Sequence, residues 1–252
     1  MRRVFMALLG IIILIPAATS FAGDCGDVDN DDALNILDVV YLINHIYKNG
    51  PEPDCGTVTD IDGNVYQTVT IGTQVWMAEN LKVTHYRNGD PIPNVTDNTE
   101  WQGLSTGAYC NYDNDEHNVA TYGRFYNWYA VDDSRNIAPE GWHVPSDAEW
   151  QTLVDFLGGD AVAGGKMKEA GYTHWLSPNT GATNESGFTA LPDGYRNYLG
   201  TFNYIGYDAY FWSSTVDYGS IAWARLLNYN YSVVYRYHNV NRSGYSVRCV
   251  KD

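Results

Sequence analysis

The residues best suited to chemistry stand near the start of the chain, in the segment DVDNDDALNILD. Its first, third, fifth, seventh, ninth and twelfth positions are Asp27, Asp29, Asp31, Ala33, Asn35 and Asp38. Five of them supply a side-chain oxygen and Ala33 supplies its backbone carbonyl, which is the ligand spacing of a twelve-residue calcium loop. The spacing predicts one bound calcium ion. The alternative is a solvated acidic loop without metal.

An amphipathic helix is expected directly after this loop and would hold its last ligands in place. Its apolar stripe has helical period and consists of Ile36, Val39, Val40, Ile43, Ile46 and Tyr47. The sequence Asn49-Gly50-Pro51 ends the pattern, because proline cannot continue a helix. The segment therefore reads as a small loop-helix module.

This module resembles a type I dockerin repeat. Asp38 stands at position 12, where an EF-hand usually has Glu, and no helix precedes the loop. Dockerins normally carry two such repeats and bind a cohesin, so the resemblance implies a calcium-binding, EF-hand-like module and a cohesin-like partner. This chain has one repeat, and Ile36 and Leu37 stand where many dockerins carry the hydroxyl residues that recognise cohesin.

The first 22 residues predict a secretory signal peptide, with Arg2 and Arg3 before an apolar run and cleavage after Ala22. A retained membrane anchor is the alternative, but the run is short for a spanning helix and contains Pro16. We therefore expect a secreted or cell-surface protein of bacterial type, without membrane insertion after cleavage. The expected domains are a signal peptide over 1–22, the loop-helix module over 23–55 and a large domain over 56–252.

The four cysteines of an exported chain predict two disulfides. Cys25 and Cys55 enclose the acidic module, and Cys110 and Cys249 lie in the large domain, so the positions favour those two pairs. A bridge around the module would stabilise it by roughly 3 to 4 kcal/mol in the chain-entropy model. The formal net charge of −15 repels a phosphate backbone, so we expect no nucleic-acid partner.

In the large domain, residues 65–71 and 74–78 predict paired strands around Gly72-Thr73, and DIDGN at 60–64 predicts a hairpin turn. One helix is expected after Ser146, which forms a capping box with Glu149, and a second short helix over 160–170. Short strands follow from Gly187 onward. The stretches 83–118 and 176–185 are expected to be loops.

Several segments of the large domain carry a family resemblance. They are DIDGNVYQTVTIGTQVWMAENLK, YGRFYNWYAV, APEGWHVPSDAEWQTLVDFLGG, GFTALPDGYR, FWSST and GYSVRCVKD, spread over 57–252. Together they resemble the Fibrobacter succinogenes major paralogous domain, which is similar to the C-type-lectin-like fold of formylglycine-generating enzymes and of retroelement variable proteins. The resemblance implies an α+β domain with two helices and a twisted antiparallel sheet, and a ligand face near the C-terminus. It carries over no catalytic activity.

The sequence offers no clear active site. GLSTG at 103–107 matches a serine-nucleophile pattern, but loop sequence surrounds it instead of a strand and a helix. The histidines have no metal-ligand spacing, and His143 is expected to be structural. A reactive cysteine pair like that of formylglycine-generating enzymes is missing, because Cys249 is the one cysteine near the C-terminus. We expect a protein that is not an enzyme. A glycoside hydrolase stays open as an alternative, because the separation of its paired carboxylates depends on the three-dimensional structure.

The closing stretch 228–243 uses only Asn, Tyr, Ser, Val, Arg and His. All of them are reachable from Asn codons by changes at adenines, as in a diversification cassette of a retroelement, and recognition loops favour Tyr, Ser and Asn. Tyr229, Tyr231, Tyr235 and Tyr237 alternate, so one strand would place them on one face. The alternative is a sheet edge without a ligand. The predicted ligand-binding residues are Trp223, Tyr229, Asn230, Tyr231, Ser232, Tyr235, Tyr237, His238 and Asn239.

The sequence thus favours an exported ligand-binding protein, with a calcium-stabilised module and a C-terminal surface that contacts a protein or a glycan. Two alternatives remain: a carbohydrate-active, polysaccharide-degrading component of a cohesin-dockerin type assembly, and a structural envelope protein.

Overall fold

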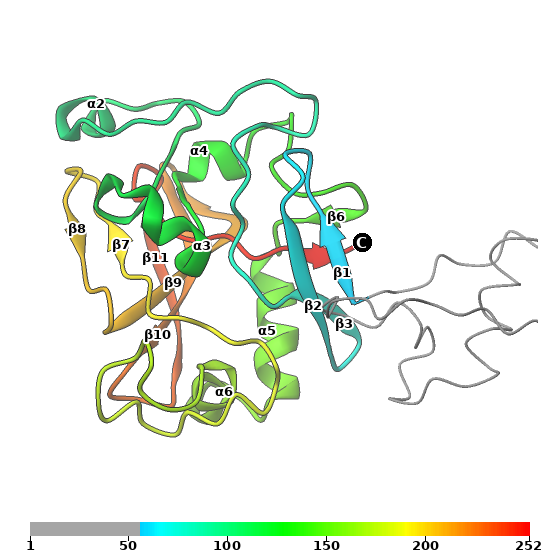
Figure 1. Ribbon diagram of the computed structural model, residues 1–252. Coiled ribbons are helices and arrows are strands. Elements are labelled where there is room, and N and C mark those ends of the chain that lie inside the picture. Colours follow the sequence, from blue (N-terminus) through cyan, green and yellow to red (C-terminus); the bar gives the residue numbers. More distant parts are fainter. Residues whose placement is uncertain (1–55) are drawn as a thin grey trace, which may run out of the picture. The chain divides into compact units, whose positions relative to one another are not determined.

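The computed structural model describes residues 56–252, which form one compact unit (Figure 1). The predicted signal peptide, calcium loop, helix and Cys25–Cys55 pair lie outside the described residues. Within 56–252, no helix combines the length and the apolar character that crossing a membrane requires.

The described unit mixes short helices with antiparallel strands. The helices are α2 (Asn98–Gln102), α3 (Val119–Tyr122), α4 (Trp128–Val131), α5 (Asp147–Phe156) and α6 (Asp160–Met167), with 3-10 turns η1 (Tyr112–Asn114) and η2 (Glu116–Asn118). The strands are β1 (Thr57–Thr59), β2 (Val65–Ile71), β3 (Gln74–Met77), β4 (Tyr109–Cys110), β5 (Phe125–Tyr126), β6 (Trp142–His143), β7 (Tyr195–Arg196), β8 (Phe202–Asn203), β9 (Asp208–Tyr218), β10 (Ile221–Asn228), β11 (Val234–Val240) and β12 (Val250–Lys251). The fold is therefore α+β, as predicted, but residues 56–252 contain five α-helices where two were expected.

The strands form two main curled sheets. The first has the order β1-β2-β3-β12-β6, so the last strand of the chain lies between two early ones, and the second has the order β11-β10-β9. Both sheets are antiparallel. Figure 1 shows α5 between them. The C-terminal residues thus close the first sheet while the hairpin β10–β11 lies in the second.

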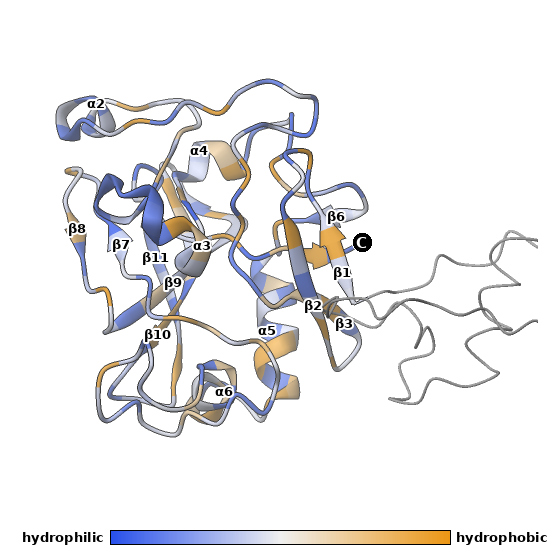
Figure 2. Cartoon of the chain, in the orientation of Figure 1, coloured by the Kyte–Doolittle hydropathy of each residue, from blue (hydrophilic) through white to orange (hydrophobic). Residues whose placement is uncertain are grey.

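Helix α5 joins the two sheets through its apolar stripe, and Figure 2 shows apolar residues along it. The rings of Trp76 on β3 and Trp150 on α5 are 4.8 Å apart between centroids, and the Trp150 indole donates to the carbonyl of Trp212 on β9 at 3.2 Å. Leu153 and Val154 are fully buried beside them. Aromatic burial of this kind contributes much of the stability of a core.

Several local predictions are confirmed. Ser146 caps α5 and forms the capping box with Glu149, and β2 pairs with β3 across Gly72-Thr73. The segment 60–64 is the turn between β1 and β2, where Asp60 accepts hydrogen bonds from the backbone N–H groups of Asp62 and Asn64. Helix α6 ends earlier than expected, because Lys168 leaves the helical conformation.

The predicted bridge between Cys110 and Cys249 is wrong, because both cysteines are free and buried. Cys110 pairs through its backbone with Phe125 in the small sheet β4–β5 and packs beside Trp101. The carbonyl of Cys249 accepts from the Met77 N–H where the inner strands β3 and β12 of the first sheet meet, in a different hydrophobic cluster. Each thiol is thus placed by its own sheet and serves as a small apolar core residue.

Candidate ligand-binding surface

The hairpin β10–β11 carries most of the predicted ligand residues. Seven consecutive residue pairs join its strands without a bulge, from Ile221↔Val240 to Leu227↔Val234. Strand β11 pairs only with β10 among the described residues, so it is an edge strand of the second sheet. Its four central residues, Tyr235 to His238, are all exposed.

The structure distributes the predicted residues over two faces and a turn. Tyr235, Tyr237 and Asn239 lie on one face of β11, whereas His238 lies on the other face with Trp223 directly opposite on β10. The remaining ones, Tyr229, Asn230, Tyr231 and Ser232, belong to the turn between the strands. The prediction that four tyrosines alternate along one strand is therefore wrong for Tyr229 and Tyr231, which precede β11.

A larger aromatic surface extends from the face of Tyr235 and Tyr237. We call it the tyrosine face; its members are Tyr195, Tyr204, Tyr207, Tyr210, Tyr229, Tyr235 and Tyr237. Tyr195 links to Tyr204 and Tyr210 at 5.9 and 4.7 Å between ring centroids, and Tyr210 links to Tyr237 at 6.0 Å. Tyr235 joins it through Leu226, which lies between Tyr235 and Tyr210 across the sheet.

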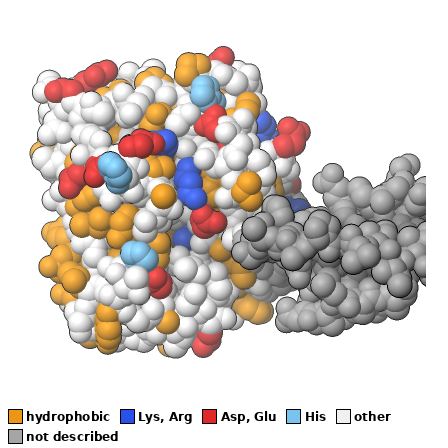
Figure 3. Space-filling model, viewed as in Figure 1, with side chains coloured by type: hydrophobic (Ala, Val, Ile, Leu, Met, Phe, Trp, Pro, Cys, Tyr) orange, Lys and Arg blue, Asp and Glu red, His pale blue; other side chains and the backbone are white. Residues whose placement is uncertain are grey.

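The tyrosines on β7, β9 and the β8–β9 connection were missed by sequence reasoning. They lie far from 228–243 along the chain, and only the pairing of β9 with β10 brings them there. Figure 3 shows hydrophobic side chains, which include tyrosine in its colouring, gathered on the left over β7, β8 and the end of β9. The recurrence of tyrosine at 195, 198, 204, 207 and 210 was the available signal.

One acidic group lies beneath the tyrosine face. The Asp208 carboxylate accepts a hydrogen bond from the Asn228 amide at 2.5 Å and from the Tyr210 hydroxyl at 3.2 Å. Burial raises the pKa of Asp208, and these two hydrogen bonds lower it by less. The exposed members of the tyrosine face offer aromatic rings and hydroxyl groups to a ligand.

The opposite face of the hairpin is built around Trp223. The Arg236 guanidinium carbon lies 3.4 Å from the Trp223 ring centroid, and the His238 ring stacks on the same tryptophan at 5.3 Å. Arg236 also pairs with Asp147 at 2.9 Å, and His238 with Asp217 at 2.6 Å. The side chains of Arg236 and His238 thus fold back onto their own sheet.

Lys168 supports the turn from below. Its buried ammonium donates to the carbonyl oxygens of Thr180, Asn228 and Tyr231 at 3.1, 3.0 and 2.9 Å. Burial lowers the pKa of Lys168 to about 8, while the three carbonyl dipoles favour its charged form. One side chain therefore links the end of β10 to the middle of the turn that joins β10 to β11.

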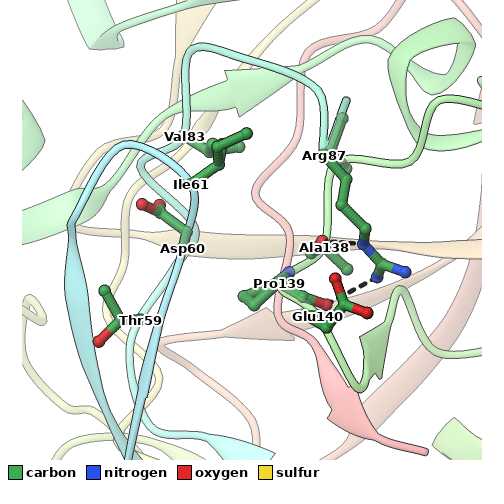
Figure 4. A pocket seen from close by; sticks show the side chains of 9 residues that line it. Thr59, Asp60, Ile61, Val83, Arg87, Ala138, Pro139 and Glu140 are labelled. Atoms are coloured by element: carbon green, nitrogen blue, oxygen red, sulfur yellow. Dashed lines mark hydrogen bonds between the residues drawn. The ribbon is translucent and has the colours of Figure 1, made fainter. Parts of the chain in front are cut away.

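A separate cavity of about 240 Å³ lies between the β1–β2 turn and residues 137–140 (Figure 4). Two of its charged side chains, Asp60 and Arg87, serve the fold. Asp60 accepts from Tyr66 and the turn backbone, and Arg87 donates to the carbonyl oxygens of Ala138 and Pro139. The cavity holds no constellation of groups free for catalysis among those side chains.

The structure also places the other residues that the sequence offered for catalysis or metal binding. GLSTG follows α2 and precedes β4, the reverse of the order that a nucleophile turn needs. Residues 56–252 contain no group of three or more histidine, cysteine or acidic residues that could hold a metal ion. Each histidine in this range hydrogen-bonds to a carboxylate, and His143 lies between Asp252 and Glu149.

Comparison with known protein families identifies the family of this chain. The family model of the Fibrobacter succinogenes major domain matches residues 69–251. The chain belongs to this family. Neither the curated proteins nor the solved structures contain a match.

In this Fibrobacter succinogenes major domain, buried polar residues of the segments GFTALPDGYR and GYSVRCVKD form hydrogen bonds between distant parts of the chain. Arg196 of GFTALPDGYR is fully buried and donates to the carbonyl oxygens of Thr96 and Gly200. Asp193 of the same segment accepts from Asn80 and from Ser246 of GYSVRCVKD. These two segments thus contribute buried polar contacts to the scaffold, whereas β11 and the turn before it lie outside them.

Proposed function

We propose that this chain is an exported, non-enzymatic ligand-binding protein. Its ligand, a protein or a glycan, would contact the hairpin β10–β11 and the tyrosine face. The domain is a scaffold of the C-type-lectin-like type in this proposal, with the variable surface near the C-terminus. The expected location is secreted or at the cell surface.

The observation that carries the proposal is the exposure of connected aromatic rings. Tyr204 and Tyr207 are 54% and 41% exposed, and Tyr235 and Tyr237 are 38% and 39% exposed. Tyrosine supplies a large, rigid contact with a polar tip at low entropic cost, which is why recognition surfaces use it. A contiguous aromatic patch of this kind on a soluble domain favours an interaction site.

The N-terminal module extends the proposal. The loop with Asp27, Asp29, Asp31, Ala33, Asn35 and Asp38 would bind calcium and present a dockerin-like helix, closed by a Cys25–Cys55 bridge. A cohesin-like protein is the partner that fits such a module. This spacing also favours the second candidate function, a carbohydrate-active component of a cohesin-dockerin type assembly; a structural envelope protein would show no saturable ligand.

Binding arrays test the proposal. Labelled full-length mature chain is applied to arrays of polysaccharides and of purified cell-surface proteins, with and without calcium. We expect saturable binding that falls at least tenfold in the double variant Tyr235→Ser, Tyr237→Ser. Tyr172→Ser is the matched control, because Tyr172 is 66% exposed and lies outside the tyrosine face. Equal loss in both variants, or no saturable binder, would refute the proposal.

Diversification of the ligand surface is a separate part of the proposal. Sequencing the 3′ end of the gene in many cells of one clonal population should show adenine-biased changes confined to codons 228–243, beside a near-copy of that stretch. A uniform sequence without such a copy would leave a binder of single specificity.

A further inference from the structure

The outer edge of β11 is regular and open. The strand has seven residues with no proline or glycine, and its pairing with β10 has no register shift, unlike the pairing of β10 with β9. Natural sheet edges are usually blunted by bulges, prolines, short length or charges that project across them. Helix α6 packs near the Val234 end, where Gly165 donates to the carbonyl of Ser232, and leaves the centre of β11 exposed.

The direction of the backbone groups follows from two flanking hydrogen bonds. The Asn241 N–H donates to the Ser220 carbonyl, and in an antiparallel ladder such bonded pairs recur at every second residue. Tyr235, Tyr237 and Asn239 therefore turn their N–H and C=O groups toward β10. Those of Arg236 and His238 point outward.

The pairing of β10 with β9 gives the same directions for the backbone groups. The Tyr229 N–H donates to the Tyr207 carbonyl, so the alternate residues Leu227 and Arg225 turn their backbone groups toward β9. Their neighbours on β10 must then face β11. Within residues 56–252, no backbone hydrogen bond reaches the outward N–H groups of Arg236 and His238.

The side chains of Arg236 and His238 do not protect this edge. Arg236 lies over Trp223 and is bound by Asp147, and the His238 ring is held between Trp223 and Asp217. Both point along a face of the sheet and away from the neighbouring strand position. Neither of these two side chains therefore projects across the edge in the way that prevents edge pairing.

The residues of the proposed binding surface lie on both faces of this one strand. Tyr235 and Tyr237 are on one side, and His238 is on the other, opposite Trp223 of β10. A ligand that touches both groups must lie along the edge between them. We propose that the ligand is an extended peptide segment of another protein, which adds to β11 as a further strand of the second sheet. This inference rests on the proposed ligand-binding function and names its partner class.

The strand geometry defines the chemistry of that peptide. Its backbone would exchange hydrogen bonds with Arg236 and His238, and its side chains would alternate between the two faces. Those beside Tyr235 and Tyr237 would be aromatic or aliphatic, since cross-strand aromatic and β-branched pairs stabilise a sheet. A segment of about five residues without proline at the bonded positions matches the exposed length of β11.

Proline substitution isolates the backbone contribution. His238→Pro removes the outward N–H at that position and leaves the bonds to β10, because an edge strand accepts proline where the N–H faces solvent. His238→Ala is the matched control, since it loses the same imidazole contacts and keeps the N–H. A displayed library of linear random peptides is selected on the full-length mature chain, and enriched peptides are synthesised and titrated against each form by fluorescence anisotropy.

We expect enriched peptides with alternating apolar residues that bind His238→Pro at least tenfold more weakly than His238→Ala, because both variants lose the imidazole and only His238→Pro also loses the N–H. Circular dichroism checks that both variants fold. Amide hydrogen exchange of the unsubstituted protein supplies the second measurement: the bound peptide should newly protect the amides of Arg236 and His238, while that of Tyr237 is already protected by β10.

Three results would overturn the inference. They are no enrichment over a blank surface, equal affinity of both His238 variants, and unchanged exchange at Arg236 and His238 on binding. Concentration-dependent dimers that His238→Pro abolishes would assign the edge to a second copy and overturn it also. If peptides fail while the arrays show a glycan that needs Tyr235 and Tyr237, the ligand-binding function stands and the strand-addition mode is wrong.

Discussion

Arg225 and Asp147 form an ion pair between β10 and the first residue of α5, with Nη1 and Oδ1 2.7 Å apart. The Arg225 side chain is 1% exposed, and its second amino group donates to the Asp147 carbonyl. Arg236 of β11 binds the same carboxylate. One aspartate thus ties the sheet that carries the proposed surface to the helix that joins the two sheets.

Asp147→Asn should lower the free energy of unfolding by about 3 to 5 kcal/mol, because it leaves the buried Arg225 charge without a counter-ion. Burial raises the pKa of Asp147, but hydrogen bonds to Arg236 and Arg225 lower it more. The lowered pKa means that this stability is present above the unfolded pKa of about 3.9 and is lost as the pH falls through the folded value. Urea unfolding measures it; the control Asp155→Asn, at an exposed position of α5, should change little.

Lys168→Met should destabilise the domain by about 2 to 4 kcal/mol, since three carbonyl oxygens lose their donor in a buried place. The turn 229–233 should also become more mobile, which amide exchange would detect. Lys166→Met is the control, because the Lys166 ammonium forms a partly exposed pair with Glu185. Equal unfolding energies for the two variants would contradict this role of Lys168.

His143 should stabilise the fold more in acid than in base. Burial lowers its pKa, but hydrogen bonds to Asp252 and Glu149 raise it more, so the net pKa lies above the ordinary value. A raised folded pKa makes the contribution fully present below the unfolded value of about 6.5, and it is lost as the pH rises through the folded pKa. His143→Gln should therefore lower the melting temperature more at pH 5.5 than at pH 8.5; an equal loss at both would count against it.

The two cysteines of the large domain should react as buried thiols. Burial raises the pKa of Cys110 to about 12 and that of Cys249 further, so the reactive thiolate is scarce in the folded protein. A disulfide reagent at pH 8 should label neither in the native protein and both after unfolding in guanidinium without reductant. No labelling after unfolding would mean that they are bridged after all.

Calcium should stabilise the N-terminal module if the loop 27–38 binds it. A chelator is expected to lower the melting temperature of the segment that contains residues 24–55, within the full chain, and Asp27→Ala should do so without chelator. Lack of any change in both experiments would remove the calcium site and the dockerin-like part of the proposal.

The parts of this fold that depend on near neighbours were predictable from sequence. The Ser146–Glu149 capping box, the hairpin at Gly72-Thr73 and the turn at Asp60 each form within a few residues. The pairing of Cys110 with Cys249 was predicted from the number of cysteines and from the assumed export of the chain. Neither indicates that the two cysteines lie in two separate sheets. The tyrosine face escaped prediction for the same reason, since β7, β9 and β11 meet only through long-range strand pairing.

The central claim is that Tyr235 and Tyr237 of the tyrosine face contact a ligand and are not needed for folding. Binding and unfolding of Tyr235→Ser, Tyr237→Ser, measured side by side, test it most directly. We predict at least a tenfold loss of binding to the array-identified ligand, with the free energy of unfolding changed by less than about 1 kcal/mol. Unchanged binding would contradict the claim, as would a loss of stability approaching the roughly 3 to 5 kcal/mol expected for truncating a buried aromatic such as Tyr245.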